Sequence, residues 1–163
     1  MNNPQTRSQQ RAQHALRWIQ EQEKKHDLKP ENKKKLRSYA ASLPAMIQMN
    51  GLGQTAAFCR SKKETEYGLL YDTLSSWLIQ GDQPCAPKEK DSKTTWDLLQ
   101  AIAQRDMGTY RAAQAEALAY LDWVKRFAQA YLTVPKSTAA SQESASEADT
   151  GTDAETETGE AGP

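Results

Sequence analysis

Helical spacing of apolar residues is the feature that most limits how this chain can fold. The clearest case is a seam whose members follow one another in steps of three and four: Tyr110, Ala113, Ala117, Leu121, Val124, Ala128 and Tyr131. Such steps place side chains on one face of an α-helix, and the small members permit a second helix to approach closely. Strand patterns are nearly absent, so the sequence predicts an all-α protein.

The remaining apolar patterns predict a compact bundle of about six helices, over residues 5–26, 30–43, 52–61, 64–80, 94–103 and 107–133. Pro44 is expected to end or kink the second helix, because proline lacks the backbone donor and clashes with the preceding turn. Ser42 would then cap a short additional helix through Met49. Asp106 is expected to cap the last helix.

Thr94 and Asp97 have the spacing of a capping box, with aspartate in place of glutamate, and are expected to open the fifth helix. The aromatic residues fall almost wholly on inward faces of the expected helices. We therefore interpret them as core residues rather than as platforms for stacking nucleic-acid bases: Tyr67, Tyr71, Trp77, Trp96, Tyr110 and Trp123.

The segment LPAMIQMNGLGQTAAF, residues 43–58, contains two glycines and resembles a phosphate-binding loop at first sight. Such a loop needs two glycines five residues apart, a lysine directly after them and a preceding strand. Gly51 and Gly53 are too close together, and no lysine follows. The segment instead predicts two helices joined by a turn at Asn50-Gly51, with these core contacts: Leu43, Ile47, Leu52, Ala56 and Phe58.

The charges divide the chain into two parts of opposite sign. Residues 136–163 hold one lysine and seven acidic residues, a net charge of 1 − 7 = −6, while residues 1–135 hold 20 basic and 14 acidic residues, net +6. The second part buries too little apolar surface to offset its ordering entropy, so we expect a helical domain over residues 1–135 and a disordered acidic tail over residues 136–163. The tail either competes for the basic surface or aids solubility, and its composition favours solubility.

Catalytic and metal-binding patterns are poorly represented. His14 and His26 are not at the spacing of a helical metal pair and are expected to be solvated. Cys59 and Cys85 are too few for a disulfide framework and are expected to be reduced thiols. The acidic residues of the helices read as caps or solvated positions: Asp72, Asp97, Asp106, Glu116 and Asp122. We therefore expect a cytoplasmic protein that is no enzyme, has no cofactor, metal or catalytic residues and makes no membrane contact, since no apolar stretch approaches about 18 residues.

Basic residues are the remaining functional signal. They would contact RNA or DNA phosphates and give a salt-dependent, largely sequence-independent affinity. Each cluster can also be read as an ordinary solvated helix face. On charge alone, the candidate RNA-binding residues are Lys24, Lys25, Arg37, Arg60, Lys62, Lys63, Arg105, Arg111 and Arg126.

Three segments resemble one protein family. LPAMIQMNGLGQTAAFCRSK, which begins at Leu43, resembles the signature of the small α-helical subunit of the type III-B CRISPR effector, the Cmr complex. YGLLYDTLSSWL (residues 67–78) is similar to the helix that follows in that family, and YRAAQAEALAYLDWVKRFAQAYL (residues 110–132) is similar to its last helix. The first segment is the most specific of the three, and residues 136–163 have no counterpart in the family pattern.

The resemblance implies a non-catalytic subunit of a ribonucleoprotein that acts in antiviral defence. Copies of the subunit would stack in a row beside the filament of backbone subunits and next to the large polymerase-like subunit. There they would support the path of the guide RNA and the target RNA. Two other hypotheses stay open: a helical adaptor that binds a protein partner through a groove without nucleic acid, and a small hydrolase or nuclease, which rests only on the available carboxylates.

Overall fold

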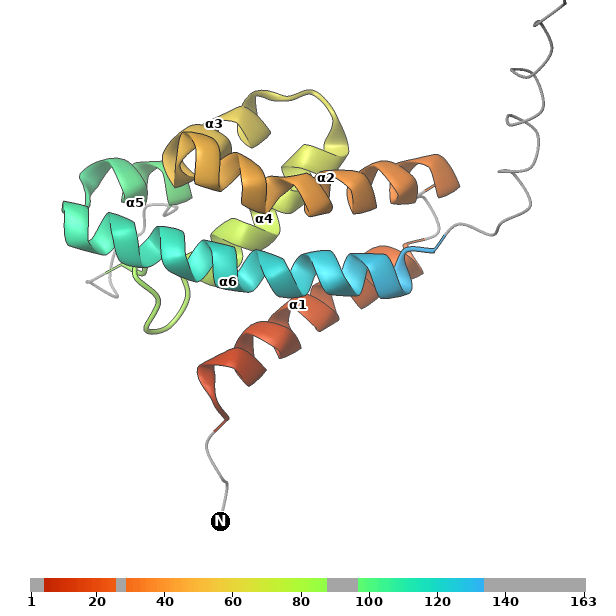
Figure 1. Ribbon diagram of the computed structural model, residues 1–163, viewed down its shortest axis with the longest axis horizontal. Helices are drawn as coiled ribbons and strands as arrows, with labels where there is room; N and C mark the ends of the chain where they lie inside the picture. The colour runs from red at the N-terminus through yellow and green to blue at the C-terminus, as the bar shows by residue number, and fades with distance from the viewer. Residues whose placement is uncertain (1–4, 26–28, 88–96, 134–163) are drawn as a thin grey trace, which may run out of the picture.

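The computed structural model describes residues 5–25, 29–87 and 97–133. In these ranges every regular element is a helix, which confirms the all-α prediction. Figure 1 shows the elements in chain order: α1 (Arg7–Lys24), α2 (Pro30–Asn50), α3 (Leu52–Ser61), α4 (Thr65–Leu78), α5 (Leu98–Gln104) and α6 (Met107–Tyr131). Residues 134–163, which include the predicted tail, lie outside the described ranges.

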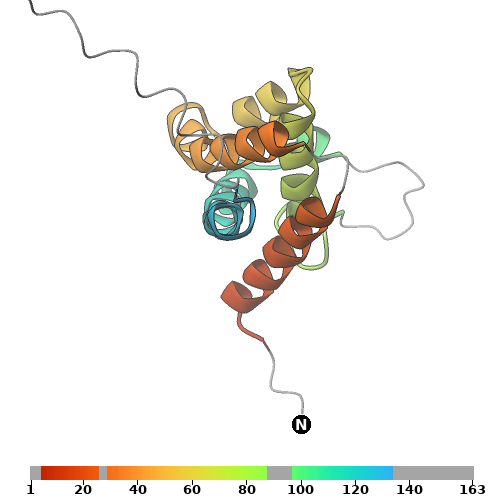
Figure 2. The same ribbon diagram turned by 90° about the vertical axis from the view of Figure 1, so that its right-hand side faces the viewer.

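Helix α6 is the centre of the bundle. It packs chiefly against α1 and α2, with α4 making further contacts (Figures 1 and 2). The small residues of the predicted seam lie in this interface, where Ala113, Ala117 and Ala128 are fully buried. The predicted seam is confirmed except at its end, since Tyr131 is exposed. The prediction omitted Tyr120, which is fully buried.

The N-terminal ends of α1 and α6 are closed by side chains. Thr6 and Gln9 form a capping box at α1. Asp106 caps α6 as predicted, since its Oδ1 accepts a hydrogen bond from the Thr109 amide at 2.9 Å. Thr94 and Trp96, which were expected in the fifth helix, lie outside the described residues. Asp97 does precede α5, but its carboxylate makes no capping hydrogen bond.

The prediction that Pro44 ends the second helix was wrong, whereas the alternative of a kink at Pro44 stays a prediction. Helix α2 continues through Pro44 to Asn50, and the Ser42 hydroxyl donates to the Tyr39 carbonyl at 3.0 Å instead of capping a new helix. A proline inside a helix costs about 3 kcal/mol. Leu43 and Ile47, on either side of Pro44, are fully buried. Their burial outweighs the missing backbone hydrogen bond, because each such side chain contributes roughly 1.5–3 kcal/mol.

The turn at Asn50-Gly51 is confirmed, and α6 completes it. Gly51 has φ 83° and ψ 162°, a conformation that is essentially restricted to glycine. The first amides of α3 are then satisfied by α6, since Leu52 N donates to Gln114 Oε1 at 3.0 Å and Gly53 N donates to Tyr110 Oη at 3.2 Å. These amides, which a phosphate loop would offer to a ligand, hold α3 against α6.

The core predictions for this segment largely held. Leu43, Ile47, Leu52 and Ala56 are buried, whereas Phe58 is partly buried. Of the predicted core aromatics, two are buried (Tyr71 and Trp77) and three are partly buried against the core (Tyr67, Tyr110 and Trp123).

Two buried threonines provide a matched test of hydrogen bonding in this core. Among the described residues, Thr55 Oγ1 has no hydrogen-bond partner, whereas Thr73 Oγ1 shares a 2.6 Å hydrogen bond with the Tyr120 hydroxyl. We expect Thr55→Val to leave the free energy of unfolding unchanged or to raise it by up to about 1 kcal/mol, since the hydroxyl is buried without compensation. Thr73→Val should lower it by about 1–2 kcal/mol. Urea denaturation of both variants measures the two changes; equal losses would contradict the assignment.

Candidate nucleic-acid interface

Among the described residues, the largest group of cations lies on three helix ends at one side of the molecule. The C-terminal end of α1, the N-terminal end of α2 and the C-terminal end of α6 lie on the same side of the molecule (Figures 1 and 2). We call the cations on these turns the basic end: Lys24, Lys25, Lys29, Lys33, Lys34, Lys35, Arg37, Lys125 and Arg126. Four acidic residues share the same turns: Glu21, Glu23, Glu31 and Asp122. These turns therefore carry nine cations and four carboxylates, an excess of five positive charges.

Most side chains of the basic end point into solvent. Among the described residues none of them forms an ion pair within 4 Å. Two have other roles: the Lys25 ammonium donates to Gln22 Oε1 at 3.2 Å, and the Lys33 ammonium donates to the Glu23 carbonyl at 3.0 Å. The second bond fixes α2 against the last turn of α1, where a cation also complements the helix dipole.

The α3–α4 corner holds a second group of predicted RNA-binding residues: Arg60, Lys62 and Lys63. Arg60 Nη1 lies 2.9 Å from Asp97 Oδ1, and its guanidinium lies over the Tyr71 ring at 5.2 Å from the centroid. The Lys62 ammonium lies over the Phe58 ring at 4.7 Å. Arg60 therefore links α3 to the start of α5 and to α4.

The last two predicted residues lie near the start of α6. Arg105, directly after α5, donates a short hydrogen bond to the Ala86 carbonyl, whereas Arg111 is exposed on α6. The nine predicted residues are thus distributed over three regions. Lys24, Lys25, Arg37 and Arg126 belong to the basic end, and the structure adds the neighbouring lysines of α2 to them.

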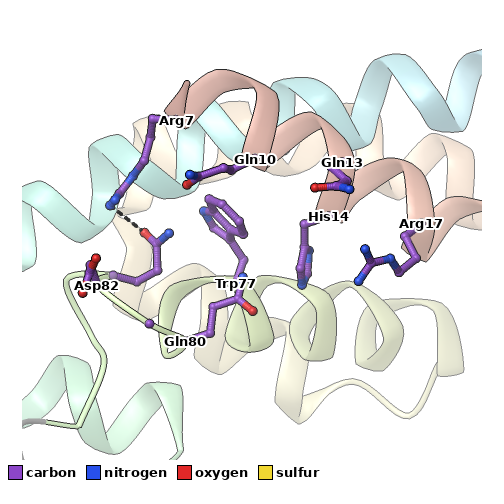
Figure 3. A pocket seen from close by; sticks show the side chains of 10 residues that line it. Arg7, Gln10, Gln13, His14, Arg17, Trp77, Gln80 and Asp82 are labelled. Atoms are coloured by element: carbon purple, nitrogen blue, oxygen red, sulfur yellow. Dashed lines mark hydrogen bonds between the residues drawn. The ribbon is translucent and has the colours of Figure 1, made fainter. Parts of the chain in front are cut away.

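A polar recess between α1 and α4 was not predicted. It has a volume of about 380 Å³, and Figure 3 shows side chains from both helices and from the turn after α4 around it. Arg7 and Arg17 of α1 lie on its wall, and Arg7 Nη2 donates to Gln83 Oε1 at 3.0 Å. Sequence spacing gave no signal for this recess, because Gln83 lies 76 residues from Arg7.

Glu116, predicted to be a cap or a solvated position, is buried in the core instead. Arg11 Nε and Nη2 donate to its two carboxylate oxygens at 2.8 and 2.7 Å, and Trp77 Nε1 donates to Oε1 at 3.0 Å. The bidentate pairing joins α1 to α6. Sequence reasoning missed it because Arg11 lies 105 residues away.

His14 was predicted to be solvated and is also incorporated in the packing. Its Nδ1 lies 2.9 Å from the Tyr120 hydroxyl, and its Nε2 lies 3.2 Å from Ser76 Oγ. The imidazole is packed against the Trp77 and Tyr120 rings at 5.3 and 5.4 Å. The histidine therefore connects α1 with α4 and α6.

The stability of the fold should depend on pH through His14. Burial, followed by the charge of Arg17, lowers the pKa of His14 below its usual 6.5, although Glu21 opposes this shift. The unfolded chain therefore binds the proton more tightly, so the contribution of the neutral imidazole is complete above pH about 6.5 and is lost as the pH falls through the lower folded pKa. We expect this loss below pH about 6.5 in thermal melts of the native chain. The loss of stability in acid should be smaller in His14→Gln. An identical pH profile for both proteins would contradict the assignment of this loss to His14.

The described residues show little that resembles a catalytic centre. No group of three or more histidine, cysteine, aspartate or glutamate side chains in them could hold a metal ion. Cys59 and Cys85 are buried thiols, and burial raises the pKa of Cys59 to about 11, which disfavours the reactive thiolate. None of the helices in the same ranges is long and apolar enough to cross a bilayer.

The fold and its charges define the class of this molecule: the described residues form a small all-α bundle with a group of cations on three helix ends. Comparison with known proteins then gives the family. Residues 7–131 match the family model described as CRISPR-associated protein (Cas_Cmr5), and the chain belongs to this family. The resemblance noted from the sequence is thereby confirmed.

Two matches from Thermus thermophilus illustrate the similarity. A protein named CRISPR system Cmr subunit Cmr5 is 29% identical over 127 residues, which cover 78% of this chain and 96% of the relative. The crystal structure of a CRISPR-associated Cmr5 family protein superposes with a TM-score of 0.62 at 27% identity, and covers 80% of this chain and 100% of the solved one.

Proposed function

We propose that this chain is the non-catalytic small subunit of a type III-B Cmr ribonucleoprotein in the cytoplasm. In this role it stacks with further copies beside the backbone subunits and the large polymerase-like subunit, and it supports the path of the guide RNA and target RNA. Family membership supports the assembly part of the proposal. The single structural observation that supports the RNA part is the basic end with its solvent-facing cations.

The chemistry of the basic end suits a partner recognised by its backbone. Lysine and arginine side chains contact phosphates without reading the bases, and a guide–target duplex obtains its sequence specificity from base pairing. A group of cations on three helix ends therefore supplies what a supporting subunit needs. The nine cations first proposed from the sequence remain the candidates, and the basic end is the region where several of them lie together.

Exposed apolar side chains support the protein contacts of the proposed assembly. Met49 at the end of α2 is 83% exposed, and Met107 at the start of α6 is 67% exposed. Flexible methionine side chains adapt to partner surfaces. The alternative of a protein adaptor without a role in RNA binding rests on the same residues. Purification of the tagged protein from its native cells separates the two: the Cmr proposal requires co-purified subunits and short guide RNAs, and the adaptor requires protein partners alone.

Two adjacent lysine pairs allow a matched test of RNA binding. Lys34 and Lys35 belong to the basic end, whereas Lys62 and Lys63 lie at the α3–α4 corner, and all four are exposed. We expect Lys34→Ala/Lys35→Ala to weaken binding of double-stranded RNA and to reduce the slope of log K against log salt by roughly 0.7–0.9 for each lost phosphate contact. Fluorescence anisotropy at several salt concentrations measures both quantities. A larger effect of Lys62→Ala/Lys63→Ala would place the interface at the corner instead.

A further inference from the structure

The last described helix, which leads into the acidic C-terminal segment, ends on the same side of the molecule as the basic end. Helix α6 ends at Tyr131, and this end lies on the same side of the molecule as the C-terminal end of α1 and the N-terminal end of α2 (Figures 1 and 2). Residues 136–163 carry seven carboxylates and one lysine. The composition of the segment alone favoured a role in solubility. The end of α6 changes that assessment, because the helix that leads into the segment ends on the side of the molecule that carries the basic end.

We propose that residues 136–163 bind the basic end of their own chain and compete there with RNA phosphates. The competition rests on the function proposed above, whereas the binding of the segment to the basic end does not. The occupant is thus a polyanion supplied by the chain itself. Its carboxylates would neutralise the surface until RNA, with its denser array of phosphates, displaces them.

Because the acidic segment is covalently attached to the helical domain, weak contacts are sufficient for it to bind the basic end. Exposed ion pairs are individually weak, but attachment through a short linker gives an effective concentration of the order of millimolar. The first carboxylate, Glu143, lies about eleven residues beyond Leu132. A flexible chain of that length has a root-mean-square span of roughly 18 Å. The segment can therefore reach the basic end without crossing the molecule.

Three cations elsewhere in the body fit the segment less well. Arg60 is paired with Asp97, and Arg105 is bonded to the Ala86 carbonyl. Arg7 lies at the start of α1, away from the end of α6 (Figure 1), and is bonded to Gln83. The basic end combines proximity to the attachment point with cations that form no ion pair among the described residues.

A full-length variant with an uncharged tail tests the competition. In it all seven acids are replaced by their amides: Glu143→Gln, Glu147→Gln, Asp149→Asn, Asp153→Asn, Glu155→Gln, Glu157→Gln and Glu160→Gln. We expect this variant to bind a double-stranded RNA roughly three- to tenfold more tightly than the native chain at about 50 mM salt, because the competitor is lost. The difference should disappear near about 0.5 M salt, where the Debye length falls to about 4 Å. A control tail with the same residues in shuffled order should behave as the native one, since only charge is required.

A double-mutant cycle separates specific docking from general repulsion of RNA. The tail is neutralised in the native background and again in Lys34→Ala/Lys35→Ala, which removes part of the proposed docking surface. Docking at the basic end predicts a smaller gain in RNA affinity in the second background. General repulsion predicts the same gain in both, and that result would overturn the proposal.

Carbodiimide crosslinking of the native chain without RNA tests the docking directly. Mass spectrometry should find the tail carboxylates linked to lysines of the basic end, more often than to Lys62 and Lys63, and the links should decrease with salt. Crosslinks spread evenly over all lysines would overturn the proposal. If no variant binds RNA but the crosslinks are found at the basic end, the proposed RNA function fails while the docking of the tail stands. If the protein binds RNA but these crosslinks are absent, the docking fails while the proposed RNA function stands.

Discussion

Gly51→Ala is expected to lower the free energy of unfolding by about 2–4 kcal/mol. The glycine has φ 83° and ψ 162°, and a side chain in this conformation costs roughly 1–3 kcal/mol. A Cβ built at Gly51 would also lie 2.9 Å from Tyr110 Oη, the atom that accepts the hydrogen bond of the Gly53 amide. The substitution therefore strains the turn and disturbs the contact between α3 and α6. Guanidinium denaturation followed by circular dichroism measures the loss.

Gly68→Ala is the matched control for this prediction. Gly68 lies inside α4, and among the described residues nothing comes within 4 Å of a Cβ built there. The control should raise the free energy of unfolding by about 0.5–1 kcal/mol, since alanine is the better helix former. Combining Gly51→Ala with Tyr110→Phe removes the hydroxyl that the new Cβ approaches. If Gly51→Ala is no more harmful than Gly68→Ala, the turn does not require glycine.

Glu116→Ala is expected to cost about 2–4 kcal/mol of unfolding free energy. The substitution removes the acceptor of three hydrogen bonds, two from Arg11 and one from Trp77, and leaves the buried indole N–H without a partner. Glu116→Gln should cost less, because the amide oxygen can still accept from Trp77. Asp122→Ala, an exposed position on the same helix, should change stability by no more than about 0.5 kcal/mol.

The pH dependence of stability should show that the negative charge of Glu116 contributes to the stability lost on its substitution. Hydrogen bonds from Arg11, the largest cause, lower the pKa of Glu116 below its usual 4.5, with a further contribution from Trp77 and opposition from burial. The carboxylate thus stabilises the fold above pH about 4.5, and this contribution is lost as the pH falls through the folded pKa. The stability difference between the native chain and Glu116→Gln should therefore shrink in acid. A difference that stays constant from neutral pH to well below pH about 4.5 would contradict this role of the charge.

Local signals predicted most of the fold. The spacing of three and four residues located α6, Asp106 identified its cap, and the Asn50-Gly51 pair identified the turn, because each signal depends on neighbours in the sequence. The prediction that Pro44 ends the second helix failed because the outcome depended on tertiary packing and not on sequence neighbours. The local cost of the proline was judged correctly, but tertiary burial of Leu43 and Ile47 decided the outcome.

The polar interior and the candidate interface were harder to predict. Glu116 and His14 read as solvated from their neighbours, and their partners lie on other helices: Arg11 lies 105 residues from Glu116, and Tyr120 lies 106 residues from His14. Charge alone selected plausible RNA-binding residues but could not show that they fall into three regions. Only the arrangement in space shows that the C-terminal ends of α1 and α6 and the N-terminal end of α2, which carry several of these residues, lie on one side of the molecule.

The pairing of α1 with α6 also has a consequence for synthesis. Helix α1 leaves the ribosome before α6, on which it docks, and Arg11 must wait for Glu116, 105 residues later. At translation rates of about 5–20 residues per second, that interval is roughly 5–20 s. During it the apolar side of α1, with Ala15 and Ile19, has no partner on α6, and the first amides of α3 lack the acceptors on Tyr110 and Gln114. The nascent chain therefore offers a binding site to chaperones until α6 emerges, and native folding is a late event in its synthesis.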